Sequence, residues 1–108
     1  MSIAIHIRYE GAKGAARAFV EEMMSSSTVA AIRAEEGNLG YNYFIPFDDP
    51  EAILLVDKWE NQDALDSHHA SPMMKTIAEL REKYDLHMSV ERFVSESLPE
   101  SDDMFVRE

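Results

Sequence analysis

The run from Gly37 to Pro72 constrains the fold more than any other stretch of the chain. It contains two segments that suit β-strands, Asn38 to Ile45 and Ala52 to Trp59, with Pro46 to Pro50 between them. Two prolines fix φ in the connecting segment and two aspartates can bond to their own backbone, so this segment predicts a turn. Two strands joined this closely are expected to pair as a hairpin.

Two helix starts follow the hairpin. Asn61 is a residue type that caps the free N–H groups of a helix, and Asp63 adds a negative charge in the first turn. Ser71 and Pro72 repeat the signal, as a cap residue followed by proline at the first helical position. The segment therefore predicts a hairpin followed by two helices.

The flanking segments complete a known pattern. Residues Ile3 to Glu10 and Leu86 to Val94 alternate between apolar and polar side chains, which predicts two further strands. Apolar residues recur at helical spacing from Ala16 to Ala34, although the hydroxyl-rich run Ser25 to Thr28 could bend or break that helix. The order is β-α-β-β-α-β with a split second helix, which is the ferredoxin-like α+β pattern.

The length and composition of the chain indicate how it divides into domains. The 108 residues suit one domain, which we expect over residues 1–94, followed by an acidic tail over 95–108. The tail composition favours disorder, although Met104, Phe105 and Val106 could add a strand to a partner.

Charge and cysteine content exclude several classes of function. The 21 acidic and 10 basic residues give a net charge of −11, which argues against nucleic acid or an anionic membrane as a partner. There is no cysteine, so neither a disulfide framework nor a thiolate site is available. The sequence has no run of 18 apolar residues and no basic leader, so we expect a cytoplasmic protein by default.

Alternation predicts which residues lie on each face of the sheet. One face should pack on the helices with Ile3, Ile5, Ile7, Leu39, Tyr41, Leu86, Met88 and Val90. The bare face should present Ala4, His6, Arg8, Asn42, Phe44, His87, Ser89 and Glu91. The strand from Ala52 to Trp59 offers two parities, and we place Asp57 and Trp59 on the bare face, although a slip of one residue would reverse this. Such a mixed face suits either the wall of a homodimeric α/β barrel that binds a small ligand or a wet dimer interface.

The order of the motifs resembles the antibiotic biosynthesis monooxygenase family over roughly residues 3 to 94. The motifs are E-x-G-N-L-x-Y from Glu35 or Glu36, the Asp49-Pro50 turn, Trp59 at the end of its strand, and A-L-x-x-H-x-x-S-P around His68. The resemblance implies a ferredoxin-like domain that dimerises sheet to sheet. In several members it also implies oxidation of a polycyclic phenol or quinol by molecular oxygen, without metal or flavin.

The resemblance suggests roles for individual residues. His68 would be the base that takes a proton from a phenol, so that the resulting anion can pass an electron to oxygen. Trp59 would be an aromatic wall, and Asn42, His6 and Arg8 would position the substrate. Phe44, Asp57 and His87 lie on the same predicted face and complete the expected substrate-binding set. Asp57 replaces the glutamate that is more usual two residues before the tryptophan.

Each of these residues also has a structural interpretation. His68 could be a packing histidine and Trp59 a core anchor, while Arg8 could pair with Glu10, Glu91 or Asp57. No spacing of His6, His68, His69 and His87 supports a metal site, so no metal or other cofactor is expected. Haem-degrading relatives place a histidine ten residues beyond His68, where this chain has Ala78.

The sequence therefore favours a homodimeric, cofactor-independent monooxygenase that acts on a quinol or related aromatic. Two functions of other classes stay open. One is a small-molecule-binding or stress-related barrel without chemistry, and the other is an oxygen-independent isomerase or lyase.

Overall fold

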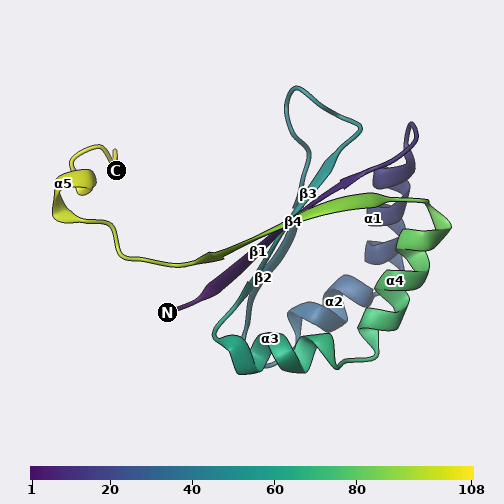
Figure 1. Ribbon diagram of the computed structural model, residues 1–108, viewed down its shortest axis with the longest axis horizontal. Coiled ribbons are helices and arrows are strands. Elements are labelled where there is room, and N and C mark those ends of the chain that lie inside the picture. Colours follow the sequence, from purple (N-terminus) through teal and green to yellow (C-terminus); the bar gives the residue numbers. More distant parts are fainter.

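The computed structural model describes all 108 residues. Its elements are β1 (Ile3–Glu10), α1 (Ala15–Ser25), α2 (Thr28–Arg33), β2 (Asn38–Phe44), β3 (Ile53–Trp59), α3 (Gln62–His69), α4 (Met73–Lys83), β4 (His87–Val94) and α5 (Glu100–Asp103). The strands form one antiparallel sheet in the order β2-β3-β1-β4, and helices α1 to α4 all lie on one side of it (Figure 1). The predicted ferredoxin-like α+β arrangement is confirmed.

The hydroxyl-rich run breaks the first helix as the sequence predicted it could. The Ser25 and Ser26 hydroxyls lie 3.4 Å from the carbonyls of Glu22 and Met23. Ser27 then adopts a left-handed backbone with φ of 64°, and α2 begins at Thr28. Side-chain competition for backbone carbonyls therefore divides one helix into two.

The two predicted caps have different outcomes. Asn61 caps α3 as expected, because its side-chain oxygen accepts a hydrogen bond from the backbone N–H of Ala64 at 2.9 Å. The prediction that Ser71 caps α4 is wrong. Its hydroxyl is buried without a hydrogen-bond partner, and its backbone carbonyl instead accepts from the N–H of Met74.

Strand pairing defines three rows across the helix-facing side of the sheet. Ile5 pairs with Asp57 on β3 and with Arg92 on β4. The next rows are Leu55–Ile7–Val90 and Ile53–Tyr9–Met88. Since side chains in register point to the same face, residues from all three strands meet over one area of the sheet.

The prediction that Asp57 and Trp59 of β3 lie on the bare face of the sheet is wrong. Trp59 pairs with Ile3 and Asp57 with Ile5, and both side chains are buried against the helices at 0% and 5% exposure. The bare face instead receives Leu54, Val56 and Lys58. Because β3 is apolar at both parities, its alternation could not decide the face, and pairing with β1 decides it.

A β-bulge explains why a second prediction, the burial of Leu39, is wrong. We expected Leu39 to pack beneath the helices with Tyr41, but it is 55% exposed. The register between β2 and β3 shifts between Asn38 and Gly40, which removes Leu39 from the alternation. Tyr41 beyond the bulge is buried as expected.

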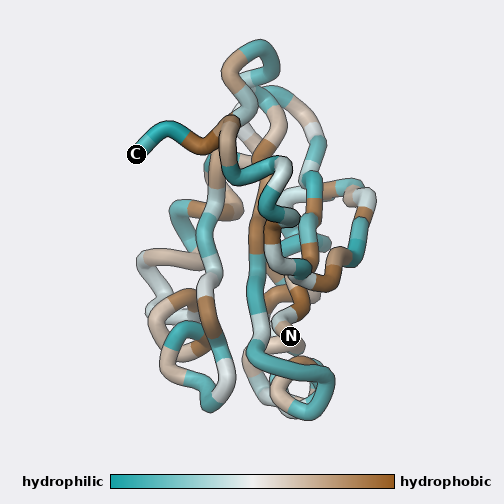
Figure 2. The backbone as a smooth tube through the Cα atoms, turned by 90° about the vertical axis from the view of Figure 1, so that its left-hand side faces the viewer, coloured by the Kyte–Doolittle hydropathy of each residue, from teal (hydrophilic) through white to brown (hydrophobic).

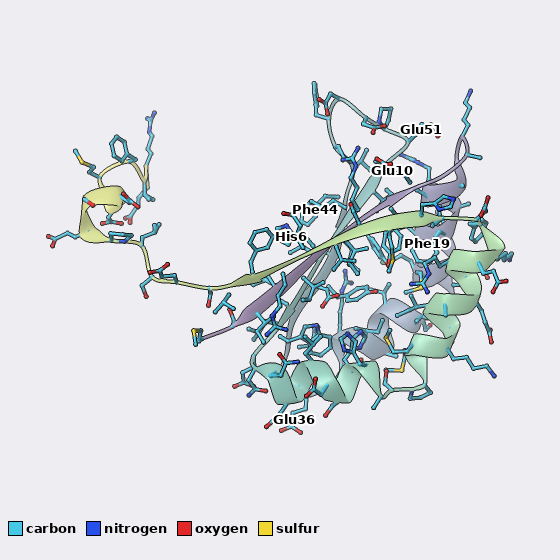
Figure 3. The ribbon with its side chains drawn as sticks, viewed as in Figure 1. His6, Glu10, Phe19, Glu36, Phe44 and Glu51 are labelled. Atoms are coloured by element: carbon cyan, nitrogen blue, oxygen red, sulfur yellow. The ribbon has the colours of Figure 1, made fainter.

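A hydrophobic core fills the space between the sheet and helices α1, α2 and α4. Phe19 of α1 packs against Tyr9 with ring centroids 5.0 Å apart, and Met23 and Ile32 are fully buried beside them. Figure 3 shows Phe19 on the helix side of the sheet and His6 and Phe44 on the other side. Burial of each such side chain stabilises the fold by roughly 1.5–3 kcal/mol.

The last residues leave the body of the molecule. The backbone N–H of Ser95 donates to the carbonyl of Ser2, after which the chain extends away from the sheet through the short α5 (Figure 1). The hydrophobic group Met104 to Val106 is exposed, and it is the brown segment just before the C-terminus in Figure 2. Its expected pairing with a partner and the division of the chain at residue 94 stay predictions.

None of the helices combines the length and the apolar character that a membrane crossing requires.

Candidate active site

A cavity of about 380 Å³ lies between the sheet and helices α3 and α4. Its walls are mostly apolar, formed by Ile5, Ile7, Leu55, Leu65, Met74, Ile77, Met88 and Val90. Four polar side chains of the buried core, Tyr9, Tyr41, Asp57 and His68, also reach it. A mostly apolar cavity with a few convergent polar groups is typical of a small-molecule site.

His68 is the buried histidine of this cavity. It lies in the last turn of α3 and is 3% exposed, and its Nδ1 lies 2.7 Å from Oε1 of Glu35. A carboxylate only accepts hydrogen bonds, so Nδ1 carries the proton and the lone pair of the neutral ring is on Nε2. Nε2 has no hydrogen-bond partner within the chain and is not fully buried. A histidine oriented in this way by a carboxylate is arranged as a general base.

Gly37 permits the contact between Glu35 and His68, which are 33 positions apart in the sequence. A Cβ at Gly37 would lie 2.5 Å from the Cβ of Ala64, and its φ is +81°. Only glycine tolerates both the left-handed backbone and this approach to α3. The turn between α2 and β2 can therefore bring the Glu35 carboxylate within hydrogen-bonding distance of His68.

Trp59 stacks against the ring of His68. The two rings stack with centroids 4.6 Å apart at 25°, and Trp59 does not line the cavity. Its indole Nε1–H donates to a carboxylate oxygen of Asp57. Stacking and the Glu35 hydrogen bond together fix the orientation of the imidazole.

Three polar groups of the cavity, Tyr9, Tyr41 and Asp57, have shifted protonation equilibria. Burial raises the pKa of the Tyr9 hydroxyl to about 12, and burial raises the pKa of Tyr41 still further above its ordinary value. Burial also raises the pKa of the Asp57 carboxyl, although the hydrogen bond from Trp59 and the nearby His68 oppose the shift. The tyrosine hydroxyls therefore stay protonated near neutral pH and can donate hydrogen bonds to an anion.

The raised pKa of Asp57 predicts how stability depends on pH. The folded state holds this proton more tightly than the unfolded chain, so unfolding releases it and the free energy of unfolding falls as pH rises. The fall begins near the ordinary carboxyl pKa of 3.8 and ends above the raised pKa. Asp57→Asn keeps an acceptor for Trp59 but removes the titration.

We therefore expect the wild type to lose stability relative to Asp57→Asn as pH rises through this window, by at most about 1.4 kcal/mol per pH unit. Urea unfolding of both proteins at several pH values measures the difference. Curves that stay parallel, or a wild type that gains stability with pH relative to the variant, would contradict the expectation.

The structure divides the predicted site residues into two sets. His68, Trp59 and Asp57 come together on the helix side of the sheet, as described above. The others, His6, Arg8, Asn42, Phe44 and His87, lie on the opposite face. The cavity shares no residue with that face, so their assignment to substrate binding stays a prediction that the cavity does not support.

The members of the second set either have other contacts or are exposed. Arg8 forms ion pairs with Glu10 at 2.7 Å and with Asp49 at 2.6 Å, which fits its structural interpretation. The His6 ring packs against Phe93 with centroids 4.7 Å apart. Asn42 accepts a hydrogen bond from Arg33 at 3.2 Å, and Phe44 and His87 are exposed.

Several residues in the cavity or in contact with its histidine were missed at the level of sequence. Glu35 stands two residues before Gly37 in the motif, but its role depends on a distant contact with α3. Arg81 follows Ile77 by one helical turn, and Arg92 continues the alternation of Met88 and Val90; a cation on such an otherwise apolar face is the signal that could have identified them. The remaining polar lining residues are Tyr9, Tyr41, Gln62 and His69.

Glu35 does not line this cavity but a second hollow of about 420 Å³, together with Glu36, Glu60, Asp63 and neighbouring residues. In the structure, no group of three or more histidine, aspartate or glutamate side chains is arranged to hold a metal ion.

The family model for antibiotic biosynthesis monooxygenase matches residues 2–80, which is most of the chain. The chain belongs to the antibiotic biosynthesis monooxygenase family. Glu35, Asp57, Trp59 and His68 all lie within the matched segment. The resemblance inferred from the motifs is thereby confirmed.

Solved structures agree with this assignment at the level of fold. A candidate antibiotic biosynthesis monooxygenase from Deinococcus radiodurans superposes with a TM-score of 0.77 at 18% identity, covering 92% of this chain and 96% of its own. Rv0793 from Mycobacterium tuberculosis gives 0.70 at 20% identity, covering 91% and 98%. SnoaB, a cofactor-independent oxygenase from Streptomyces nogalater, gives 0.71 at 19% identity, covering 92% and 98%. No curated protein sequence is significantly similar to this member of the family.

Proposed function

We propose that this protein is a monooxygenase that uses molecular oxygen to oxidise a quinol or a related electron-rich phenol. The observation that carries the proposal is the Glu35–His68 pair, which presents a free imidazole nitrogen to an apolar cavity. Family membership supports the same reaction class. The cavity volume suits an aromatic molecule of two or three rings.

The proposed reaction begins with proton transfer. Nε2 of His68 removes a proton from the substrate, and the hydroxyls of Tyr9 and Tyr41 stabilise the resulting oxyanion. The anion passes one electron to oxygen, which gives a substrate radical and superoxide. These combine through a new C–O bond to form a peroxide, and His68 returns the proton to it. Loss of water then leaves a carbonyl, so that one oxygen atom enters the product and the other leaves as water.

No cofactor is required by this scheme, because the deprotonated aromatic ring itself supplies the electrons. SnoaB, which shares the fold, is a cofactor-independent oxygenase, and this supports the same property here. Trp59 has a positioning role in the scheme, since it contacts His68 and does not line the cavity.

We also propose that the bare face of the sheet binds a second copy of the chain. Phe44 and Phe93 on this face are 52% and 45% exposed, and Leu54 and Val56 lie between them on β3. An apolar sheet face of this kind is typical of a homodimer interface. The cavity lies on the other side, so each subunit would hold a complete site.

Oxygen uptake by metal-stripped protein tests the proposed function. We expect consumption of one oxygen molecule per substrate when anthrone or a naphthoquinol is supplied, above the rate of spontaneous oxidation. Absence of uptake across such a panel would overturn the proposal. Conversion of the substrate under anaerobic conditions would favour an isomerase, and binding without conversion would favour a binding protein.

A further inference from the structure

The proposed reaction contains a second proton-transfer step, which His68 does not complete alone. When the oxidised carbon of the substrate is a CH₂ group, as in anthrone, the peroxide sits on a carbon that still carries a hydrogen atom. It becomes a carbonyl when that carbon loses a proton and the O–O bond breaks. His68 is neutral after it has returned its first proton, so it can take this one too. The oxygen that leaves needs a proton from a second group to become water.

Most polar groups in the lining of the cavity are unsuited to donate this proton. Burial raises the pKa of Tyr9 to about 12 and the pKa of Tyr41 still further, so both hydroxyls retain their protons. Asp57 is 5% exposed and accepts the indole N–H of Trp59, so its carboxyl does not exchange protons freely with solvent. The arginine and glutamine side chains of the lining do not exchange a proton near neutral pH.

Imidazole is the side-chain type that gains and loses a proton between pH 5 and 8. Besides His68, the lining of the cavity contains one imidazole, that of His69. By elimination, His69 is the lining residue suited to donate the second proton.

His69 lies at the opening of the cavity. The solvent-exposed residues of the lining mark this opening, and they are Gln62, His69, Met88, Val90 and Arg92. The ring of His69 contacts the ring of His68 and takes part in no ion pair. His68, in contrast, is 3% exposed and is held by Glu35. His69 can therefore take up a proton from solvent, whereas His68 cannot do so directly.

The two histidine rings are close enough to act on one peroxide group. Their centroids are 5.8 Å apart. An oxygen atom that hydrogen-bonds to a nitrogen of each ring at about 2.8 Å fits between rings at this separation. Positive charge on His69 also acts to lower the pKa of Asp57, so its influence reaches the polar end of the cavity.

We propose that His69 is a second catalytic residue, which donates a proton to the leaving oxygen of the peroxide while Nε2 of His68 removes the proton from carbon. The electron pair of the C–H bond forms the C=O bond, the O–O bond breaks, and the outer oxygen leaves as water. His68 then carries one proton more than before and His69 one fewer, and the released water can pass the proton back. The peroxide is the only oxidant in this step. The assignment rests on the proposed function, which supplies the peroxide.

Elimination from a preformed hydroperoxide tests this proposal without oxygen. Fluorenyl hydroperoxide carries the same CH–OOH group on a fused aromatic ring system, and the absorbance of fluorenone measures its conversion under anaerobic conditions. We expect wild-type protein to form fluorenone faster than buffer does, and His69→Gln to lower the protein-dependent rate by about a hundredfold. Added imidazole should restore at least about tenfold of this loss, because position 69 is open to solvent. Such a rescue distinguishes a missing proton donor from a distorted cavity.

His87→Gln is the matched control. It removes an exposed histidine that does not line the cavity, so the rate of elimination should change by less than about twofold. A His69→Gln protein as fast as the wild type, an equal loss in His87→Gln, a loss that imidazole does not restore, or no acceleration by the wild type would overturn the proposal.

Oxygen uptake from anthrone separates this proposal from the proposed function. In the first turnover His69→Gln should consume oxygen at close to the wild-type rate and accumulate a peroxide, because His68 still removes the first proton. Loss of uptake in His69→Gln without peroxide would contradict this division of roles. Elimination that depends on His69, together with no oxygen uptake by the wild type, would remove the monooxygenase and leave the second step standing. Uptake by the wild type together with equal elimination in both proteins would do the reverse.

Discussion

Replacing His68 with alanine is expected to lower the rate of oxygen uptake by about a hundredfold to ten-thousandfold. The change removes the only buried imidazole of the cavity, and with it the group that takes the substrate proton. Steady-state rates at saturating substrate measure the loss, and near-ultraviolet circular dichroism checks that the aromatic packing around Trp59 survives. Glu35→Gln keeps an acceptor for Nδ1 but loses the charge, so its effect should be smaller.

His87→Ala is the matched control for this prediction. His87 is an exposed histidine on the opposite face of the sheet and was part of the substrate-binding set predicted from the sequence. Its replacement should change the rate by less than about twofold, because surface substitutions away from a site have small effects. Equal losses in the two variants would show that the site is not the cavity between the sheet and the helices.

Trp59→Ala is expected to reduce the free energy of unfolding by about 3–5 kcal/mol. The indole is fully buried, stacks on His68 and donates to the buried Asp57 carboxylate, so its removal creates a cavity and leaves a carboxylate unpaired. Domains of this size are stable by roughly 5–15 kcal/mol, so much of the variant would unfold under mild conditions. Urea denaturation followed by far-ultraviolet circular dichroism measures the loss.

Phe47→Ala serves as the control for Trp59, since it removes another aromatic side chain from a position outside both the core and the proposed dimer face. Phe47 is fully exposed between β2 and β3, and its loss should change the free energy of unfolding by less than roughly 0.5 kcal/mol. A Trp59→Ala protein as stable as Phe47→Ala would contradict the buried, supporting position of the indole. It would instead favour the wall position that the motif alone suggested.

The fold could be predicted because its signals are local. Alternation in β1, the proline and aspartate turn, the Asn61 cap and the hydroxyl-rich break each depend on neighbouring residues, and the structure has all of them. The prediction of which side of β3 is buried failed because that signal is not local. Leu54 and Leu55 are equally apolar, so only pairing with β1, nearly fifty residues away, decides which of them is buried.

The candidate site was predictable only in part. The motif identifies His68, but its partnership with Glu35 depends on the close approach of Gly37 to Ala64, which no local pattern reveals. Trp59 was expected to contact substrate because the family resemblance suggested an aromatic wall and the predicted face of its strand agreed with it. The register instead places it behind the histidine. Arg81 and Arg92 come from α4 and β4, so their presence in the lining of one cavity is a property of the tertiary structure.

Anaerobic titration of the protein with anthrone tests most directly whether the cavity histidine removes the substrate proton. Without oxygen the reaction stops at the anion, whose visible absorption distinguishes it from neutral anthrone. We expect wild-type protein to produce the anion band in proportion to bound ligand, and His68→Ala to bind anthrone without producing it. An equal band in both proteins, or none in a wild type that binds the ligand, would show that His68 is not the base.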